Sequence, residues 1–309
     1  MSLADNLTRS CAESGAGLPF ELVLRTEARL ATVRFLRQRA FPEELALLDR
    51  FLSHLGITDA LDRERAHRER TLASWLRDSR RFYKTLSPAR QRVWLPLAPE
   101  LEATLRQGAF LVGTHFGGAL VTALALSRLR LPIFVIVRSP PGSLPLSDSF
   151  EICDLRKESA HRAMMTARAK LRRGQIVFLA GDVPSASEDG NLRLNALGRT
   201  RMISRGFAEL SLASSVPPTP IFSRVEASGK IYTWLEPPLA ASGDSHAARV
   251  LSLATTYGCL VSTIFSRHPG NVPARALRAY FDRPPYSPAP TSDGTAAAVH
   301  RGFGAMSQP

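Results

Sequence analysis

The feature that most constrains the fold is the alternation of short apolar runs with helix-like segments between Leu105 and Leu239. The apolar runs that we expect to be strands are 110–113, 133–137, 176–180, 219–225 and 231–236. The segments that we expect to be helices are 119–129, 159–173, 204–214 and, beyond this region, 245–266. Short buried strands separated by helices predict an α/β fold, in which helices flank a mostly parallel central sheet.

The residues before this region are predicted to form a helical section. Apolar side chains recur in roughly helical register over 18–39. Pro42 suits the first turn of a second helix, over 43–55. Thr58 and Asp59 are residues of the kind that cap a third helix.

We expect one large domain over 18–283, because a chain of 309 residues can bury a sizeable core. Within it, the helical section occupies 18–104 and the α/β core occupies 105–283. Residues 1–17 are expected to be flexible. The tail from Pro284 is rich in Pro, Ser, Ala and Gly, which predicts disorder.

The composition predicts an ordinary globular protein, since 44% of its residues are hydrophobic. Its three cysteines, Cys11, Cys153 and Cys259, are widely separated. They form no C-x-x-C pair and no Cys/His spacing of the kind that zinc sites use. We therefore expect neither a disulfide framework nor a metal site, and a protein that is cytosolic or faces the cytosol.

The formal net charge of +13 predicts attraction to anionic partners, which include nucleic acid, an anionic membrane surface and an acidic carrier protein. A soluble basic surface without such a partner is the alternative. No zinc-finger spacing, RNA-recognition signature or clear helix-turn-helix pattern supports nucleic acid as the partner. No secretory signal is evident, and no uninterrupted run of about 18 apolar residues occurs. Any membrane association is therefore expected to be peripheral.

His115 lies in a glycine-rich segment, Gly-Thr-His-Phe-Gly-Gly, directly after the expected strand 110–113 and before the expected helix 119–129. A strand-turn-helix junction of this kind exposes a side chain beside free backbone N–H groups. Histidine titrates near neutral pH, so this is a suitable position for a catalytic base. The alternative is a histidine that caps the helix or packs within the loop.

Five stretches, in this order, resemble the lysophospholipid acyltransferase superfamily, and most closely the branch of bacterial lipid A biosynthesis (lauroyl/myristoyl) acyltransferases. The stretches are 111–118 (LVGTHFGG), 133–140 (IFVIVRSP), 171–182 (LRRGQIVFLAGD), 197–198 (LG) with 204–210 (SRGFAEL), and 220–224 (PIFSR) with 235–239 (LEPPL). The likeness covers about residues 18 to 282. It implies a glycerolipid acyltransferase-like fold with His115 as the catalytic histidine.

The resemblance also implies a reaction. An acyl group would pass from an acyl carrier protein or coenzyme A thioester to a hydroxyl of a glycolipid or lipid-like acceptor. His115 would remove the proton from that hydroxyl, and the chemistry needs no metal or redox cofactor. Both donors are acidic, which suits the basic chain. The protein would bind peripherally at the anionic cytoplasmic face of the inner membrane.

The family pattern has an Asp or Glu five positions after the histidine, and here that position is Leu120. In the family this carboxylate fixes the histidine tautomer and stabilises the imidazolium. Three interpretations follow. A carboxylate elsewhere substitutes, and Asp182 is the best candidate; or the enzyme runs slowly on His115 alone; or the chain is a catalytically silent lipid- or carrier-binding relative.

Asp182 also follows an expected strand, at the end where α/β folds place their sites, although it can equally be a turn residue before Pro184. The resemblance implies that Arg138 and Arg156 meet acidic groups of the substrate, as arginine does in bidentate fashion, although an arginine at a strand end, such as Arg138, can equally be solvated. Gly117 and Gly118 fall in the histidine block and are expected to contact substrate.

The remaining polar candidates are expected to be structural. Ser204 suits the N-cap of the helix that follows it, and Glu209 falls within that helix. No motif surrounds the other histidines, which are expected at the surface: His54, His67, His161, His246, His268 and His300.

Overall fold

The computed structural model describes residues 29, 31–78, 99–117, 122–123, 125–126, 129–138, 149–182 and 190–282. The expected flexible N-terminus and the expected disordered tail lie outside these residues, as does most of the predicted helix over 18–39. Of the described residues of the predicted helix over 119–129, residues 122–123 and 125–126 are helical and residue 129 lies in a turn.

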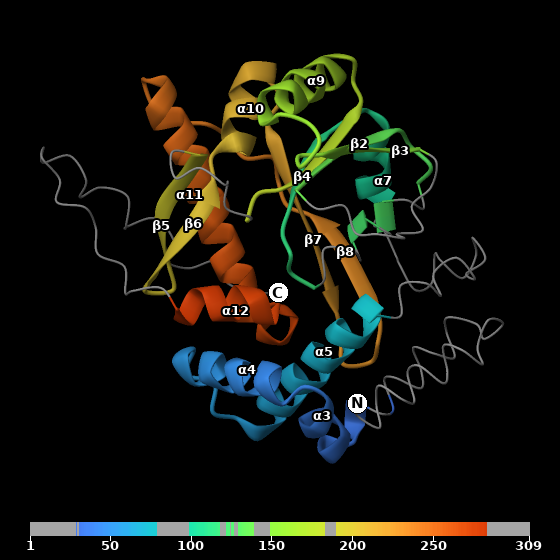
Figure 1. Ribbon diagram of the computed structural model, residues 1–309, viewed down its shortest axis with the longest axis vertical. Coiled ribbons are helices and arrows are strands. Elements are labelled where there is room, and N and C mark those ends of the chain that lie inside the picture. The colour runs from blue at the N-terminus through green and yellow to red at the C-terminus, as the bar shows by residue number, and fades with distance from the viewer. Residues whose placement is uncertain are drawn as a thin grey trace, which may run out of the picture.

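A mostly parallel sheet of six strands forms the centre of the described chain, as predicted (Figure 1). Its order is β3-β2-β4-β1-β7-β8, and all neighbours are parallel except the antiparallel pair β7 and β8. The strands are β1 (Phe110–Gly113), β2 (Ile133–Val137), β3 (Phe150–Asp154), β4 (Ile176–Ala180), β7 (Pro218–Val225) and β8 (Ile231–Leu235). The first, second and fourth of these have the predicted bounds.

Successive side chains of the central strands belong to two separate apolar layers, one on each face of the sheet, because a strand alternates its side chains between faces. Phe110 and Val112 of β1 belong to the larger layer, while Leu111 belongs to the smaller one. Helices α9 (Ala160–Arg172), α10 (Gly206–Ser214) and α11 (His246–Arg267) contribute to the larger layer, and α7 (Pro99–Arg106) contributes to the smaller one. Both faces of the sheet are thus covered, which explains the nearly continuous apolar runs.

The helical section consists of α3 (Arg34–Ala40), α4 (Pro42–His54) and α5 (Ala60–Asp78). Pro42 occupies the first turn of α4, as predicted. Asp59 accepts hydrogen bonds from the main-chain N–H groups of Leu61 and Asp62, at 2.9 Å each, and so caps the third helix. Both observations confirm the sequence-based helix starts.

Several elements were not predicted: α7, strand β3, the hairpin of β5 (Asn191–Ala196) and β6 (Arg199–Ser204), and the C-terminal turn η3 (Pro269–Asn271) with helix α12 (Ala274–Phe281). β3 carries charges at both Glu151 and Asp154, so it lacks the apolar run of a central strand. The hairpin is stabilised by its two-residue turn, in which Leu197 and Gly198 both have positive φ. Such a turn matches the twist of the flanking strands.

Two expectations about single residues were wrong. The N-cap of α10 is Arg205 rather than Ser204, because Ser204 still belongs to β6; its hydroxyl accepts the Gly206 N–H at 3.3 Å instead. His67 and His268 are half-buried rather than exposed. Each has a polar partner, Asp49 for His67 and Arg224 for His268. Burial, followed by the charge of Arg224, lowers the pKa of His268 to about 4.

α11 is the one helix among the described residues that is long and apolar enough to cross a membrane. Half of its most apolar stretch is buried inside the protein, where Leu253, Tyr257 and Val261 belong to the larger apolar layer. The helix packs against α10, η3 and the β5–β6 hairpin, beside which it lies in Figure 1.

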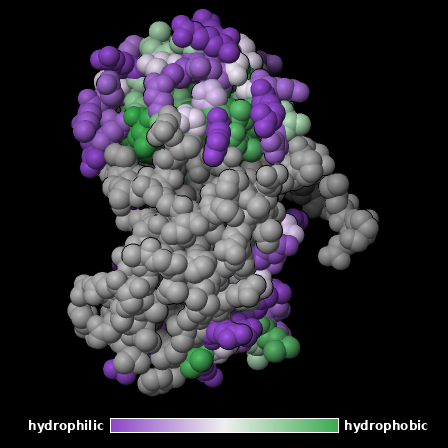
Figure 2. Space-filling view, turned by 90° about the vertical axis from the view of Figure 1, so that its right-hand side faces the viewer, coloured by the Kyte–Doolittle hydropathy of each residue, from purple (hydrophilic) through white to green (hydrophobic). Residues whose placement is uncertain are grey.

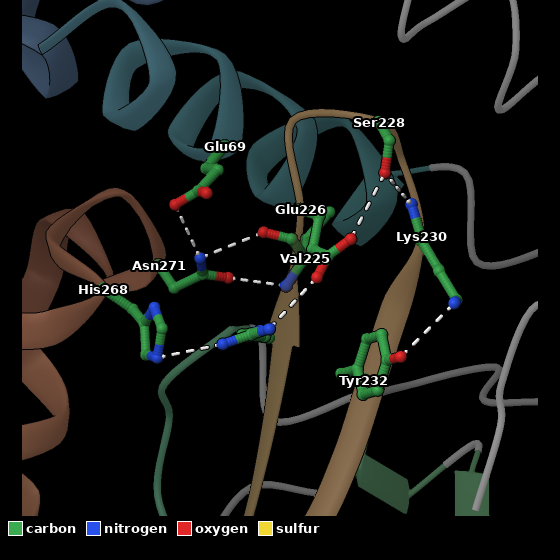
Figure 3. A network of polar contacts seen from close by, with 9 residues as sticks. Glu69, Val225, Glu226, Ser228, Lys230, Tyr232, His268 and Asn271 are labelled. Carbon is green, nitrogen blue, oxygen red and sulfur yellow. Dashed lines mark hydrogen bonds and ion pairs between the residues drawn. The ribbon is translucent and has the colours of Figure 1, made fainter. Parts of the chain in front are cut away.

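The helical section joins the core where α5 meets η3. Glu69 of α5 accepts a hydrogen bond from Asn271 Nδ2 at 3.2 Å (Figure 3). Next to it, Arg70 donates to the Val272 carbonyl at 2.7 Å. Glu69 is buried. Burial raises its pKa from 4.5 to about 7, although Arg65 and Arg224 oppose the shift.

This buried acid predicts a pH-dependent stability. The folded protein keeps the Glu69 proton up to about pH 7, whereas the unfolded chain loses it near its ordinary pKa of 4.5, so the free energy of unfolding falls as pH rises through this window. Glu69→Gln should therefore raise the free energy of unfolding by about 1–3 kcal/mol at about pH 8 and change it little at about pH 4. Urea unfolding at both pH values measures the difference; an equal effect at both would contradict it.

Candidate active site

The structure brings His115 and Asp182 together from adjacent strands. His115 follows β1 and Asp182 follows β4, and His115 Nδ1 lies 3.0 Å from Asp182 Oδ1. The ladder pairs Gly113 with Ala180, and the two residues continue that register two positions beyond the strand ends. Both therefore emerge side by side at the carboxyl edge of the sheet, where open α/β sheets bind ligands.

The two oxygens of Asp182 are both used. Oδ1 faces the imidazole, and Oδ2 accepts the main-chain N–H of His115 at 3.0 Å. Arg201 of β6 lies 3.8 Å from the same Oδ2. The Asp182 side chain is only 4% exposed, whereas that of His115 is 42% exposed, so the carboxylate is inside and the imidazole faces outward.

The electrostatics of the pair favour a charged carboxylate and a basic imidazole. Burial alone would raise the pKa of Asp182, but the charge and hydrogen bond of His115, and then Arg201, hold it below its ordinary value. Burial lowers the pKa of His115, while the charge and hydrogen bond of Asp182 outweigh that effect and raise it overall. Arg275 and Arg201 oppose this rise.

The strand ends that carry the pair are fixed by close packing. The Gly113 carbonyl accepts hydrogen bonds from the Tyr257 hydroxyl at 2.6 Å and from the Gly181 N–H at 3.0 Å. A Cβ at Gly181 would lie within 2.8 Å of the Tyr257 ring and 2.7 Å of Val112. Burial, followed by the charge of Asp182, raises the pKa of Tyr257 well above its ordinary value, so this phenol is neutral.

The expectation of free backbone N–H groups beside His115 was wrong for the described part of the turn. The N–H of His115 goes to Asp182, that of Phe116 goes to Thr114 Oγ1 at 3.1 Å, and that of Gly117 goes to the Asn271 carbonyl at 2.9 Å. The loop folds back against the protein, so its donors are satisfied internally.

Of the four residues expected to contact substrate, only Arg138 lies exposed at the same edge of the sheet without a described ion pair. It follows β2, two strand spacings or about 10 Å from β1. Arg156 follows β3 and binds Asp154, its Nη2 lying 2.8 Å from Oδ2. Gly117 is buried, and a Cβ there would meet the Ser223 carbonyl oxygen at 1.8 Å, so its absence of a side chain serves packing. Gly118 and Leu120 lie outside the described residues.

Sequence reasoning missed Arg201 and Tyr257. Arg201 approaches Asp182 only because the unpredicted hairpin folds over α11, where its guanidinium lies 4.7 Å from the centre of the Phe265 ring. Tyr257 is one of many apolar positions along α11, and nothing local distinguishes it. A signal was present for the pair itself: His115 and Asp182 each come two residues after a predicted strand.

Among the described residues, no group of three or more histidine, cysteine or acidic side chains is arranged to hold a metal ion. Neither a comparison with protein-family models nor a search of curated proteins finds a match for this chain.

The geometry predicts that Asp182 controls the titration of His115. In Asp182→Asn the negative charge is lost while burial and the two arginines remain, so the His115 pKa should fall below its ordinary value of about 6.5. NMR titration of the histidine ring measures this without a substrate. Asp154→Asn, which changes another buried aspartate at the same sheet edge, should leave the His115 titration unchanged. An unshifted His115 in Asp182→Asn would contradict the assignment.

Proposed function

We propose that the protein is an acyltransferase with His115 as its general base, and that it moves an acyl group from a carrier thioester to a hydroxyl of a glycolipid or lipid-like acceptor. The observation that carries the proposal is the contact of His115 Nδ1 with the buried carboxylate of Asp182. The sequence blocks around both residues resemble those of lysophospholipid acyltransferases, with the lipid A biosynthesis branch most similar. The mixed α/β sheet is compatible with a glycerolipid acyltransferase-like fold.

Asp182 would do the work that the family assigns to the carboxylate missing at Leu120. Its Oδ1 accepts the Nδ1 proton of neutral His115, which leaves Nε2 as the basic nitrogen. No described residue is hydrogen-bonded to Nε2, and the ring is partly exposed. Of the three interpretations of Leu120, a relocated carboxylate therefore agrees best with the geometry.

The reaction then proceeds in two balanced steps. His115 Nε2 takes the proton of the acceptor hydroxyl while the hydroxyl oxygen attacks the thioester carbonyl. Asp182 stabilises the imidazolium that forms. The tetrahedral intermediate expels the carrier thiolate, and the imidazolium returns the proton to that sulfur. An ester and a free thiol result, and His115 regains its neutral form. The residues described here thus account for every proton that moves.

The charge of the chain supports acidic partners. The formal net charge is +13, and α9 carries Arg162, Arg168, Lys170 and Arg172 without an acidic residue. Figure 2 shows that, on the side of the molecule toward β3, the described surface is mostly hydrophilic with small hydrophobic patches. Acyl carrier protein and coenzyme A are both acidic, as is the inner leaflet of a bacterial membrane.

The proposed function predicts that His115→Ala loses acyl-transfer activity while the protein stays folded. Acyl transfer from acyl carrier protein or coenzyme A donors should fall by at least about 10²-fold, because a general base contributes that much. The variant should remain folded, with a lower thermal midpoint because the buried Asp182 loses the hydrogen bond of the imidazole. In the wild type the rate should rise with pH through the His115 pKa, since only the neutral ring accepts a proton. His161→Ala, a change of an exposed histidine on α9, should have full activity.

Two outcomes would count against the enzyme. Wild-type turnover by folded His115→Ala would remove the assignment of the base. If wild type is inert with both donors over several hydroxyl acceptors, yet binds lipid or carrier protein, the chain is the catalytically silent relative.

The positive charge predicts peripheral membrane binding that depends on salt. The protein should sediment with vesicles that contain anionic phosphatidylglycerol and be released as salt approaches about 1 M, where charge interactions are screened within about 3 Å. Vesicles of neutral phosphatidylcholine alone should retain much less protein. Retention through high salt and alkaline carbonate would instead require an embedded anchor.

A further inference from the structure

The His115 loop continues along β7 after β1 has ended. β1 pairs with β7 only as far as Gly113 opposite Ile221, whereas β7 runs on to Val225. Gly117 lies against this extension, with its missing Cβ aimed at the Ser223 carbonyl. On the other side β8 pairs with β7 up to Val225 opposite Ile231. The end of β7 therefore has a strand neighbour on one side only.

The carboxamide of Asn271 fills the open side. Its Oδ1 accepts the Val225 N–H at 2.7 Å, and its Nδ2 donates to the Val225 carbonyl at 3.0 Å (Figure 3). One side chain thus binds both main-chain groups of Val225, as a residue of a neighbouring strand would. Asn271 is only 1% exposed, so these hydrogen bonds are shielded from water.

The main chain of Asn271 holds the His115 loop at the same time. Its carbonyl accepts the N–H of Gly117 at 2.9 Å, two residues after His115. Phe116, which lies between His115 and Gly117 in the chain, packs on Phe265 with ring centres 5.7 Å apart. Gly117 has a φ of +62°, a conformation that needs an external constraint to persist in one state.

α5 in turn fixes Asn271. The second Nδ2 hydrogen goes to Glu69 Oε2 at 3.2 Å. The side-chain oxygen, both Nδ2 hydrogens and the main-chain carbonyl of Asn271 therefore all have partners. Gly270 approaches α5 so closely that a Cβ there would lie 2.5 Å from the Ala66 carbonyl oxygen. The turn that carries Asn271 therefore cannot shift without moving α5.

We propose that Asn271 is a positioning residue for His115: its side chain anchors η3 to β7 and α5, and its carbonyl sets the path of the loop that carries the imidazole. Asn271 touches no reacting group. It acts through Gly117, and it links the N-terminal helical section to the site. The expected fall in kcat rests on the proposed acyl transfer. The expected shift of the His115 pKa does not depend on that function.

Asn271→Ala tests the proposal in the full-length protein. Without the anchor, His115 should lose its fixed contact with Asp182, so its pKa should fall toward its ordinary value of about 6.5 by NMR titration. If acyl transfer is detected in wild type, kcat should fall roughly 10–100-fold with little change in KM, because only the orientation of the base is affected. Asn271→Asp keeps the size but loses both Nδ2 donors and places a carboxylate oxygen against the Val225 carbonyl and Glu69, so it should shift the His115 pKa at least as much as Asn271→Ala.

Two control variants separate positioning from general loss of stability. Leu171→Ala removes a buried side chain of α9 and should lower the thermal midpoint without shifting the His115 pKa. Glu69→Gln keeps an oxygen that can accept the Asn271 Nδ2 hydrogen, and it should also leave His115 unchanged. A shift in Leu171→Ala as large as that in Asn271→Ala would overturn the proposal.

The wild-type protein supplies a measurement that needs no variant. The Gly117 amide should be among the protected amides in hydrogen exchange, because Asn271 accepts its hydrogen bond. Exchange of Gly117 at the rate of an open loop would overturn the proposal, as would an unshifted His115 pKa in folded Asn271→Ala. A titrating, Asn271-dependent His115 in a protein without acyl transfer would instead retain the positioning role and reject the proposed function.

Discussion

The candidate site depends on the pairing of the buried Asp182 carboxylate with His115. A carboxylate that is 4% exposed is costly to bury unless it is paired and hydrogen-bonded. His115 meets this need twice, through its main-chain N–H and through its ring, and Arg201 lies nearby. The charge of Asp182 therefore depends on the loop after β1, and the conformation of that loop depends on Asp182.

This mutual dependence extends to the hydrogen bonds of the turn. Every N–H from His115 to Gly117 has a partner within the protein. A loop whose own donors are satisfied is rigid, which suits a residue that must present one ring nitrogen in a fixed direction. It also means that these three N–H groups are not available to stabilise negative charge on a substrate oxygen. A donor for that purpose has to come from another part of the site.

The sequence predicted the central strands well because their signal is local. Buried parallel strands read as continuous apolar runs, and β1, β2 and β4 have the bounds expected from them. β3 was missed because Glu151 and Asp154 interrupt its apolar character at the edge of the sheet. The β5–β6 hairpin contains no continuous apolar run; in β5 polar and apolar residues alternate, as in a strand with one buried face, and the hairpin is stabilised by its turn and by packing on α11.

The site was predictable only in part, because only some of its residues carry a local sequence signal. His115 stood out through its local motif, and Asp182 through its place after a strand. Nothing near Asn271 in the sequence indicates that its carboxamide would bind Val225, 46 residues earlier, or Glu69, 202 residues earlier. Contacts of such separation are set by the assembled fold, so their participants carry no periodicity or motif.

In the proposed acyltransferase, the parallel register explains how Asp182 would replace the carboxylate that the family pattern has at the position of Leu120. The ladder between β1 and β4 pairs Phe110 with Val177 and Gly113 with Ala180, and continuing it by two residues pairs His115 with Asp182. A residue at that position on the neighbouring strand is about 4.8 Å away, close enough for a short side chain to reach the imidazole. The family pattern places its carboxylate on the helix after the turn, on the same chain segment as the histidine. A carboxylate from β4 reaches Nδ1 from the sheet instead, and it adds a bond to the histidine main chain. Since the neutral ring has one Nδ1 proton to donate, the proposed mechanism needs no second acid at the position of Leu120.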